Sequence, residues 1–280
     1  MNPMNTFGST TVCYPLSVDA AFTLERALQG IAGVGLKYVE LVAIPGYCPH
    51  LTPESMGSEE IDALVALLQQ YDLRVSVINV AADLTTGSGV QLLGHTMRVA
   101  RALGVSTIVT HVEQTETEGG AARFRQLLPE ILDLAQNFGT TIALETHGGL
   151  VTTGTQGLEF LKEVGSGSLK MTYDMANVVY YGGMLPEADL SKMKDDIGAY
   201  IGHVHLKDKA NMKLREYDFP PFGEGILDFA AVVGLLEEGG YEGHMSLEVE
   251  LDGAPDSPER VDEALATSFE YLKSLDGVAQ

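Results

Sequence analysis

The sequence is poor in cysteine and in basic residues. Cys13 and Cys48 are its only two cysteines, too few for a disulfide framework and without metal-site spacing, and they predict free thiols in a reducing cytoplasm. Lysine and arginine number 17 against 39 aspartates and glutamates, so the formal net charge is −22. A chain this acidic repels nucleic acid phosphates and anionic membrane surfaces. We therefore expect no nucleic acid and no membrane as partner.

Long apolar runs, a targeting segment and linkers are also missing. No stretch approaches the roughly 20 consecutive apolar residues that a membrane span needs. Residues 1–11 contain no basic region followed by an apolar run, so we expect no export signal and a cytoplasmic protein. No segment rich in proline, glycine or serine divides the chain, which predicts one domain over residues 1–280.

Short apolar runs rich in β-branched residues alternate with longer amphipathic stretches. The predicted strands are Thr10–Pro15, Tyr38–Val42, Arg74–Asn79, Thr107–His111, Thr141–Thr146, Lys170–Asp174, Gly202–Lys207 and His244–Glu250. The predicted helices are Ala20–Ala32, Glu59–Gln70, Gln91–Leu103, Ala122–Phe138, Phe229–Glu238 and Pro258–Ser274, with a weaker one around Glu187–Lys194. This alternation predicts a parallel sheet of the α/β class, closed into a (β/α)8 TIM barrel. An open doubly wound sheet is the alternative, but the first strand–helix turn lacks a dinucleotide-binding glycine pattern.

Polar side chains lie on the inner face of the last four predicted strands. Alternate side chains of a strand point to opposite sides, so Ile142 and Leu144 face the helices while Glu145 faces the barrel interior. The same rule places the following polar residues inside: His147, Thr172, Asp174, His203, His205, Lys207, Ser246, Glu248 and Glu250. Most lie toward the C-terminal ends of their strands, where barrel active sites are found.

Carboxylates gathered in a barrel mouth repel one another and lose hydration. A divalent cation offsets both effects, and three carboxylates with one imidazole suit Mn²⁺, Mg²⁺ or Co²⁺ better than a thiolate-type zinc site would. A single carboxylate at a strand end is often a helix cap, and a single inward histidine is often a core residue. Four such residues on successive strands favour one divalent metal ion, with Mn²⁺ the preferred choice.

The sequence resembles the xylose-isomerase-like barrel superfamily over nearly its whole length. The resemblance is to the sugar phosphate isomerase/epimerase branch, which includes ketose 3-epimerases and inosose dehydratase. It is carried by the segments Leu36–Leu41, Ile142–His147, Tyr173–Asn177, His203–Asp208, Phe222–Ile226 and Ser246–Glu250. Members of the branch hold their metal through a Glu, an Asp, a His and a Glu on the last four strands. The matching positions are Glu145, Asp174, His205 and Glu248; His205 is favoured over His203, and Glu248 over Glu250.

The sequence departs from the ketose 3-epimerases at two places. They often carry a substrate-contacting His three residues after the metal-binding Asp of the sixth strand, where this chain has Asn177. They also place a Glu and an Arg shortly after the metal-binding His, where this chain has Lys207 and Asp208. The metal-binding pattern is kept, whereas the substrate-binding pattern is not. The resemblance also implies a homo-oligomer, either a dimer or a tetramer.

The predicted chemistry is proton abstraction next to a carbonyl of a sugar-like small molecule, such as a ketose, keto-sugar or cyclitol. Glu145 and Glu248 are the candidate catalytic residues, one removing a proton and the other returning it through an enediolate, which makes the chain an isomerase or epimerase. A lyase that eliminates water, as an inosose dehydratase does, is the alternative. The acidity of the chain favours a neutral substrate over a sugar phosphate, although Gly223–Gly225 opens a helix where barrels often bind phosphate.

Five residues are candidates for binding substrate. They are His147, Asn177, Lys207, His111 and Glu40. For Lys207 a salt bridge to a carboxylate is an equally favoured role, and for Glu40 a structural role is favoured.

Two further functions remain as alternatives. An abasic-site endonuclease shares the barrel, but its metal cluster needs more histidines at the mouth than the seven of this whole chain comfortably provide. A partner subunit without catalysis would bind ligand but not turn it over.

Overall fold

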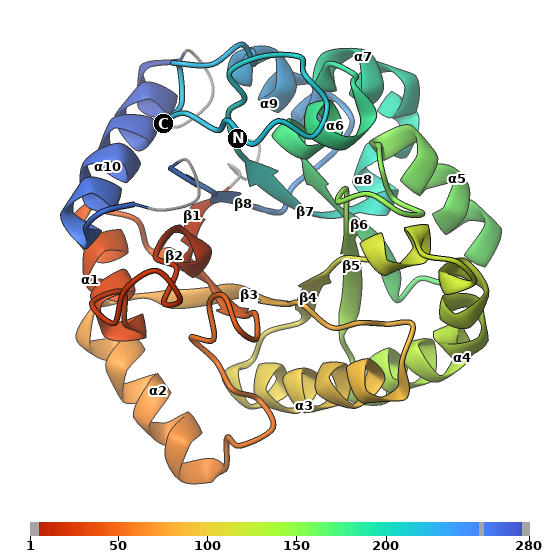
Figure 1. Cartoon of the computed structure of the whole chain (residues 1–280), viewed down its shortest axis with the longest axis horizontal. Coiled ribbons are helices and arrows are strands. Elements are labelled where there is room, and N and C mark those ends of the chain that lie inside the picture. The colour runs from red at the N-terminus through yellow and green to blue at the C-terminus, as the bar shows by residue number, and fades with distance from the viewer. Residues whose placement is uncertain (1–5, 252–254, 276–280) are drawn as a thin grey trace.

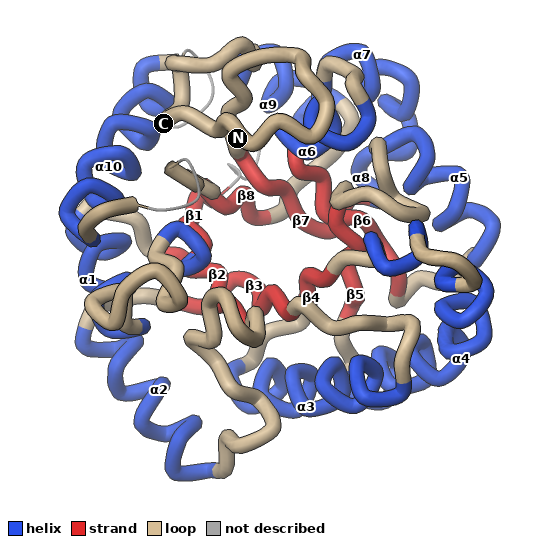
Figure 2. Tube along the Cα trace, viewed as in Figure 1, coloured by secondary structure: helices blue, strands red, loops and turns tan. Residues whose placement is uncertain are grey.

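The computed structural model describes residues 6–251 and 255–275 of the chain. Within these ranges eight parallel strands close into a barrel in chain order. They are β1 (Thr6–Thr10), β2 (Tyr38–Ala43), β3 (Arg74–Val80), β4 (Thr107–Thr110), β5 (Thr141–Glu145), β6 (Leu169–Asp174), β7 (Ile201–Leu206) and β8 (His244–Leu247). Figure 2 shows them as an inner ring inside an outer ring of helices. The predicted (β/α)8 TIM barrel of the α/β class is therefore confirmed.

The helices follow the strands around the barrel (Figure 1). They are α1 (Leu24–Gly33), α2 (Ser58–Gln70), α3 (Gly87–Leu103), α4 (Gly120–Phe138), α5 (Gly154–Val164), α6 (Met175–Gly182), α7 (Pro186–Leu190), α8 (Ile197–Tyr200), α9 (Phe229–Glu238) and α10 (Pro258–Ser274). Many begin at a side-chain cap; Thr23, for example, accepts a hydrogen bond from the backbone N–H of Arg26. Among the described residues, none of these helices is both long and apolar enough to cross a bilayer.

The two faces of the strands have opposite polarity, as the alternation predicts. Outward side chains such as Leu144, Tyr173 and Leu206 are fully buried in the apolar layer between sheet and helices. The interior of the barrel, in contrast, holds buried polar groups, which include Glu40 and His203. The large majority of buried polar side chains in proteins have hydrogen-bond partners, so this interior predicts a connected polar network.

The predicted first strand, Thr10–Pro15, is wrong. The strand is β1, and Thr11–Cys13 instead forms a 3-10 turn capped by Thr10. Gly8 explains the position of β1, because a Cβ there would lie 2.7 Å from the carbonyl oxygen of Tyr38 on the neighbouring strand. Pairing with β2 and β8 thus determines which residues form the first strand. The apolar run that suggested a strand at Thr10–Pro15 is buried, but it forms the 3-10 turn and the start of the following loop.

The helices between the later strands also differ from the sequence prediction. The named helices included none between the fifth and sixth strands, where α5 lies, and α6 directly after β6 was missed. The weak helix expected around Glu187–Lys194 is divided into α7 and a 3-10 segment, Ser191–Asp196. The predicted last strand continued to Glu250, whereas β8 ends at Leu247, so Glu248 and Glu250 lie just after the strand.

Candidate metal centre and active site

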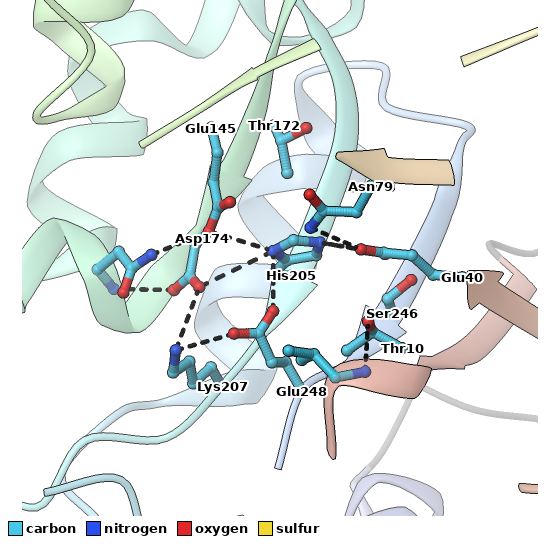
Figure 3. A network of polar contacts seen from close by, with 12 residues as sticks. Thr10, Glu40, Asn79, Glu145, Thr172, Asp174, His205, Lys207, Ser246 and Glu248 are labelled. Carbon is cyan, nitrogen blue, oxygen red and sulfur yellow. Dashed lines mark hydrogen bonds and ion pairs between the residues drawn. The ribbon is translucent and has the colours of Figure 1, made fainter. Parts of the chain in front are cut away.

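Four acidic or imidazole side chains converge at the C-terminal ends of the last four strands. They are Glu145 of β5, Asp174 of β6, His205 of β7 and Glu248 just after β8, and one ligand atom of each lies within 4.8 Å of all the others. His205 Nδ1 is 3.1 Å from Glu248 Oε2, 3.4 Å from Glu145 Oε1 and 3.9 Å from Asp174 Oδ2. Figure 3 shows the four side chains pointing toward one another. The structure thus brings together the whole predicted ligand set.

The start of α6 places two of these carboxylates. Asp174 caps the helix, because its Oδ1 accepts hydrogen bonds of 2.8 Å from the backbone N–H groups of Ala176 and Asn177. This leaves Asp174 Oδ2 turned to the other three groups. The Asn177 side chain, one turn into the helix, donates a 3.0 Å hydrogen bond to Glu145 Oε1. The cap of a single helix therefore orients carboxylates from two strands.

The buried polar atoms of this cluster fit a divalent metal ion. Asp174 Oδ2 and His205 Nδ1 are buried and lack a hydrogen-bond partner. Burial raises the pKa of Asp174 to about 6 and that of Glu248 to about 7. Burial also disfavours the ionised form of Glu145, but the charge and hydrogen bond of His205, together with the charges of His147 and His111, outweigh it and lower that pKa to about 2. Hard oxygen donors and one imidazole are the ligands that Mn²⁺, Mg²⁺ and related cations accept.

Metal binding should therefore stabilise the folded protein. At about 100 times its dissociation constant, Mn²⁺ should raise the free energy of unfolding by about 2.7 kcal/mol, because the cluster exists only in the folded chain. Thermal unfolding of chelator-treated protein, with and without added Mn²⁺, measures the shift. An unfolding midpoint that changes neither on chelator treatment nor on addition of Mn²⁺ would count against a metal in this cluster.

Lys207 links the four-residue cluster to Glu250, a carboxylate outside it. Its Nζ lies 2.9 Å from Glu248 Oε1 and 4.0 Å from Asp174 Oδ2, and it forms an ion pair with Glu250. Nζ also lies 4.3 Å from the centre of the Phe219 ring. The predicted salt bridge of Lys207 is confirmed. Glu250 is thus a partner of the lysine and stands outside the ligand cluster, which agrees with the choice of Glu248.

A cavity of about 290 Å³ opens above the cluster. Glu145 and Glu248 contribute to its wall, as do four of the predicted substrate-binding residues: His111, His147, Asn177 and Lys207. The wall also contains aromatic side chains that sequence reasoning missed: Tyr47, Tyr180, Tyr181, Tyr217 and Phe219. They come mostly from loops and helix ends, where no periodic pattern marks a residue as facing a site.

The loop after β7 is held in place by Asp208. Its carboxylate accepts hydrogen bonds from the backbone N–H groups of Gly223 and Gly225 at 2.9 Å and of Leu227 at 3.3 Å. A Cβ on Gly225 would lie 2.2 Å from Asp208 Oδ1, so the loop requires glycine at this position. The backbone N–H groups of Gly223 and Gly225 are therefore occupied internally, which removes the phosphate-binding interpretation of this segment.

His147, at the cavity wall, belongs to a small group of polar side chains. Its Nδ1 is 3.2 Å from Glu113 Oε2, and its ring nitrogens are 3.2 Å from the hydroxyl of Tyr181. The His111 ring lies 4.8 Å from it, centre to centre. Burial alone would lower the pKa of His147, but the hydrogen bond and charge of Glu113 raise it. Glu113 lies two residues beyond the predicted strand Thr107–His111, in a 3-10 turn, so the strand alternation did not single it out.

Glu40 lies behind His205 and not at the cavity wall. The side chain is fully buried, and its carboxylate is within 3.1 Å of His205 Nε2 and 2.9 Å of His203 Nε2. These contacts agree with the structural role that was favoured for Glu40 and give no support to a role in binding substrate.

The curated relatives that this chain resembles include an L-ribulose 3-epimerase and inosose dehydratases. The L-ribulose 3-epimerase of Mesorhizobium japonicum is 25% identical over 277 residues, which cover 92% of this chain and 84% of that enzyme. The inosose dehydratase of Serratia proteamaculans is 29% identical over 157 residues, 51% of this chain and 48% of that enzyme. Several of the curated relatives are in fact matched over about half of their length or less.

A solved structure and a family model agree with the fold. The zinc-bound structure of the IolI protein superposes with a TM-score of 0.74 over 95% of each chain, at 20% identity. The family model described as xylose isomerase-like TIM barrel matches residues 28–275. This chain therefore belongs to the xylose isomerase-like TIM barrel family.

Proposed function

We propose that the chain is a divalent-metal-dependent isomerase or epimerase that moves a proton next to the carbonyl of a ketose, keto-sugar or cyclitol. One observation carries the proposal. Glu145 and Glu248 are 5% and 7% exposed and line the cavity, whereas Asp174 and His205 are 0% exposed beneath it. A ligand in the cavity can thus contact two carboxylates of the cluster, while the other two groups serve the metal alone.

Glu145, Asp174, His205 and Glu248 would hold the metal, for which we propose Mn²⁺. When bound, the cation supplies a Lewis acid that polarises a carbonyl oxygen and stabilises negative charge on it. Asn177 orients Glu145 through a 3.0 Å hydrogen bond, and Lys207 orients Glu248 at 2.9 Å. One carboxylate removes the proton from carbon and the other delivers a proton to the opposite face, so the configuration at that carbon is inverted.

The cavity wall favours an uncharged substrate. Among its described residues Lys207 is the one lysine, arginine is absent, and two cluster carboxylates lie beside it. Lys207 is already paired with Glu248 and Glu250. The remaining wall of tyrosine, histidine and asparagine offers hydrogen bonds to sugar hydroxyls, with the aromatic rings excluding water.

Dehydration is the second candidate, and His147 is the observation that favours it. Glu113 raises the pKa of this histidine at the cavity wall, so the imidazole is able to give a proton to a leaving hydroxyl group. One cluster carboxylate would remove the proton from carbon, and the C–O bond of the neighbouring hydroxyl would break as His147 protonates it, so that water leaves and a carbon–carbon double bond forms. Asn177, which replaces the histidine of the epimerase pattern, is consistent with such a difference in substrate handling.

Incubating the Mn²⁺-loaded protein with ketopentoses, ketohexoses and inososes in D₂O separates the two functions. Epimerisation should give a product of altered configuration that carries one deuterium at the inverted carbon. Dehydration should give a product that has lost one water. Mass spectrometry and NMR spectroscopy distinguish them, and absence of both products with every substrate class would contradict the proposal.

The compartment and the assembly remain predictions. Cys13 and Cys48 are free and buried, which is consistent with the cytoplasm as the proposed location. A homo-oligomer, dimer or tetramer, stays a prediction from the resemblance.

A further inference from the structure

The two nitrogens of His205 face opposite environments. Nδ1 faces the ligand cluster, 3.1 Å from Glu248 and 3.4 Å from Glu145. Nε2 faces the interior of the barrel, where both carboxylate oxygens of Glu40 lie 3.1 Å away. Figure 3 shows the imidazole between the two groups, with Glu40 reaching it from β2.

The environment of Glu40 allows it to act only as an acceptor. The side chain is 0% exposed, Asn79 donates a hydrogen bond to Oε1, and Nε2 of both His205 and His203 lies within hydrogen-bond distance of the carboxylate. An imidazole that binds a metal through one nitrogen carries its N–H on the other, and an ionised carboxylate accepts but cannot donate. With a metal at Nδ1, the N–H of His205 would be on Nε2, where Glu40 accepts it.

We propose that Glu40 is a positioning residue that fixes the tautomer and orientation of His205, so that Nδ1 is presented to the metal. The inference rests on the proposed metal-dependent function but assigns a role to a residue that lies outside the cavity wall and contacts the cluster only through His205. A carboxylate behind a metal-binding histidine orients the ring and increases its basicity, and its removal lowers metal affinity by about 10- to 100-fold.

Glu40→Gln tests the proposal, because glutamine keeps the shape of the side chain and removes its charge. The matched control is His203→Phe, which keeps a ring but removes the 2.9 Å contact between His203 Nε2 and Glu40 and leaves the contact of Glu40 to His205 unchanged. Competition with a chelator gives the dissociation constants of Mn²⁺ and Co²⁺, and the visible spectrum of bound Co²⁺ reports the ligand geometry. We expect an affinity about 10- to 100-fold weaker and an altered spectrum in Glu40→Gln, with a clearly smaller loss of affinity in the control.

A measurement on the wild-type protein loaded with diamagnetic Zn²⁺ keeps the inference testable even if Glu40→Gln does not fold. The ¹⁵N shifts of His205 should show a metal-bound Nδ1 and a protonated Nε2; metal binding through Nε2 would overturn the inference. So would equal metal affinities in wild type and Glu40→Gln. A second bound metal that disappears in Glu40→Gln would also overturn it, since Glu40 would then be a ligand. Failure of the wild type to bind any metal would instead overturn the proposed function.

Discussion

Replacing Asp174 by asparagine should lower kcat/KM by about a thousandfold or more and leave the barrel folded. Asp174 Oδ2 is the buried, unpartnered oxygen of the cluster, and asparagine would place either a neutral oxygen or an N–H group there. The electrostatic effect of a metal on a developing negative charge amounts to several kcal/mol, and each 1.4 kcal/mol or so is about tenfold in rate. Steady-state kinetics and the metal content of the purified variant measure the effect.

Asp228→Asn is the matched control for this variant. Asp228 caps α9 by accepting a 3.0 Å hydrogen bond from the backbone N–H of Ala231, and it is exposed. Asparagine retains an acceptor at both capping positions, so the stability of the two helices should change little. Activity should survive in Asp228→Asn and be lost in Asp174→Asn. Full metal content and turnover in Asp174→Asn would rule out the four-residue centre.

Replacing Lys207 by methionine should reduce the free energy of unfolding of the metal-free protein by about 3–5 kcal/mol. The lysine is 4% exposed and is the cation between Glu248 and Glu250, two carboxylates that are themselves largely buried. Methionine keeps most of the volume of the side chain but removes the counter-charge of Glu250 and leaves Glu248 with His205 as its remaining partner. Urea unfolding of the metal-free protein measures the loss.

The control is Lys213→Met, which removes an exposed lysine of the same loop. Lys213 pairs with Glu216 at 3.0 Å, and their side chains are 70% and 41% exposed. Solvent screens such a pair, so the expected loss is no more than about 1 kcal/mol. Similar losses in the two variants would mean that the Lys207 ion pairs contribute no more than a surface contact, and Lys207 would then be free to bind substrate.

Alternation along single strands explains why much of the site was predictable. The period of two that places Leu144 among the apolar side chains also places Glu145 inside, and the same holds for Leu206 and His205. Parallel strands end at one rim of a barrel, so inward polar residues at those ends must approach one another. Local sequence was therefore sufficient to nominate the cluster that the structure brings together.

Groups defined by contacts between distant segments were not predictable in the same way. Glu40 is inward by the alternation rule, but its position behind His205 depends on how β2 and β7 face each other across the barrel. Tyr217 and Phe219 reach the cavity because Asp208 binds the backbone of their loop. No pattern within a short stretch of sequence records such a contact.

By itself the sequence determined the closed parallel barrel and the inward polar residues at the ends of its last strands, because strand–helix alternation and the period of a strand are local properties. Only the tertiary structure decided where the first strand lies, which nitrogen of His205 faces the four-residue cluster, and which aromatic side chains enclose the cavity. Each of these depends on the distance between residues far apart in the chain, and that distance is set by strand pairing and packing around the whole barrel.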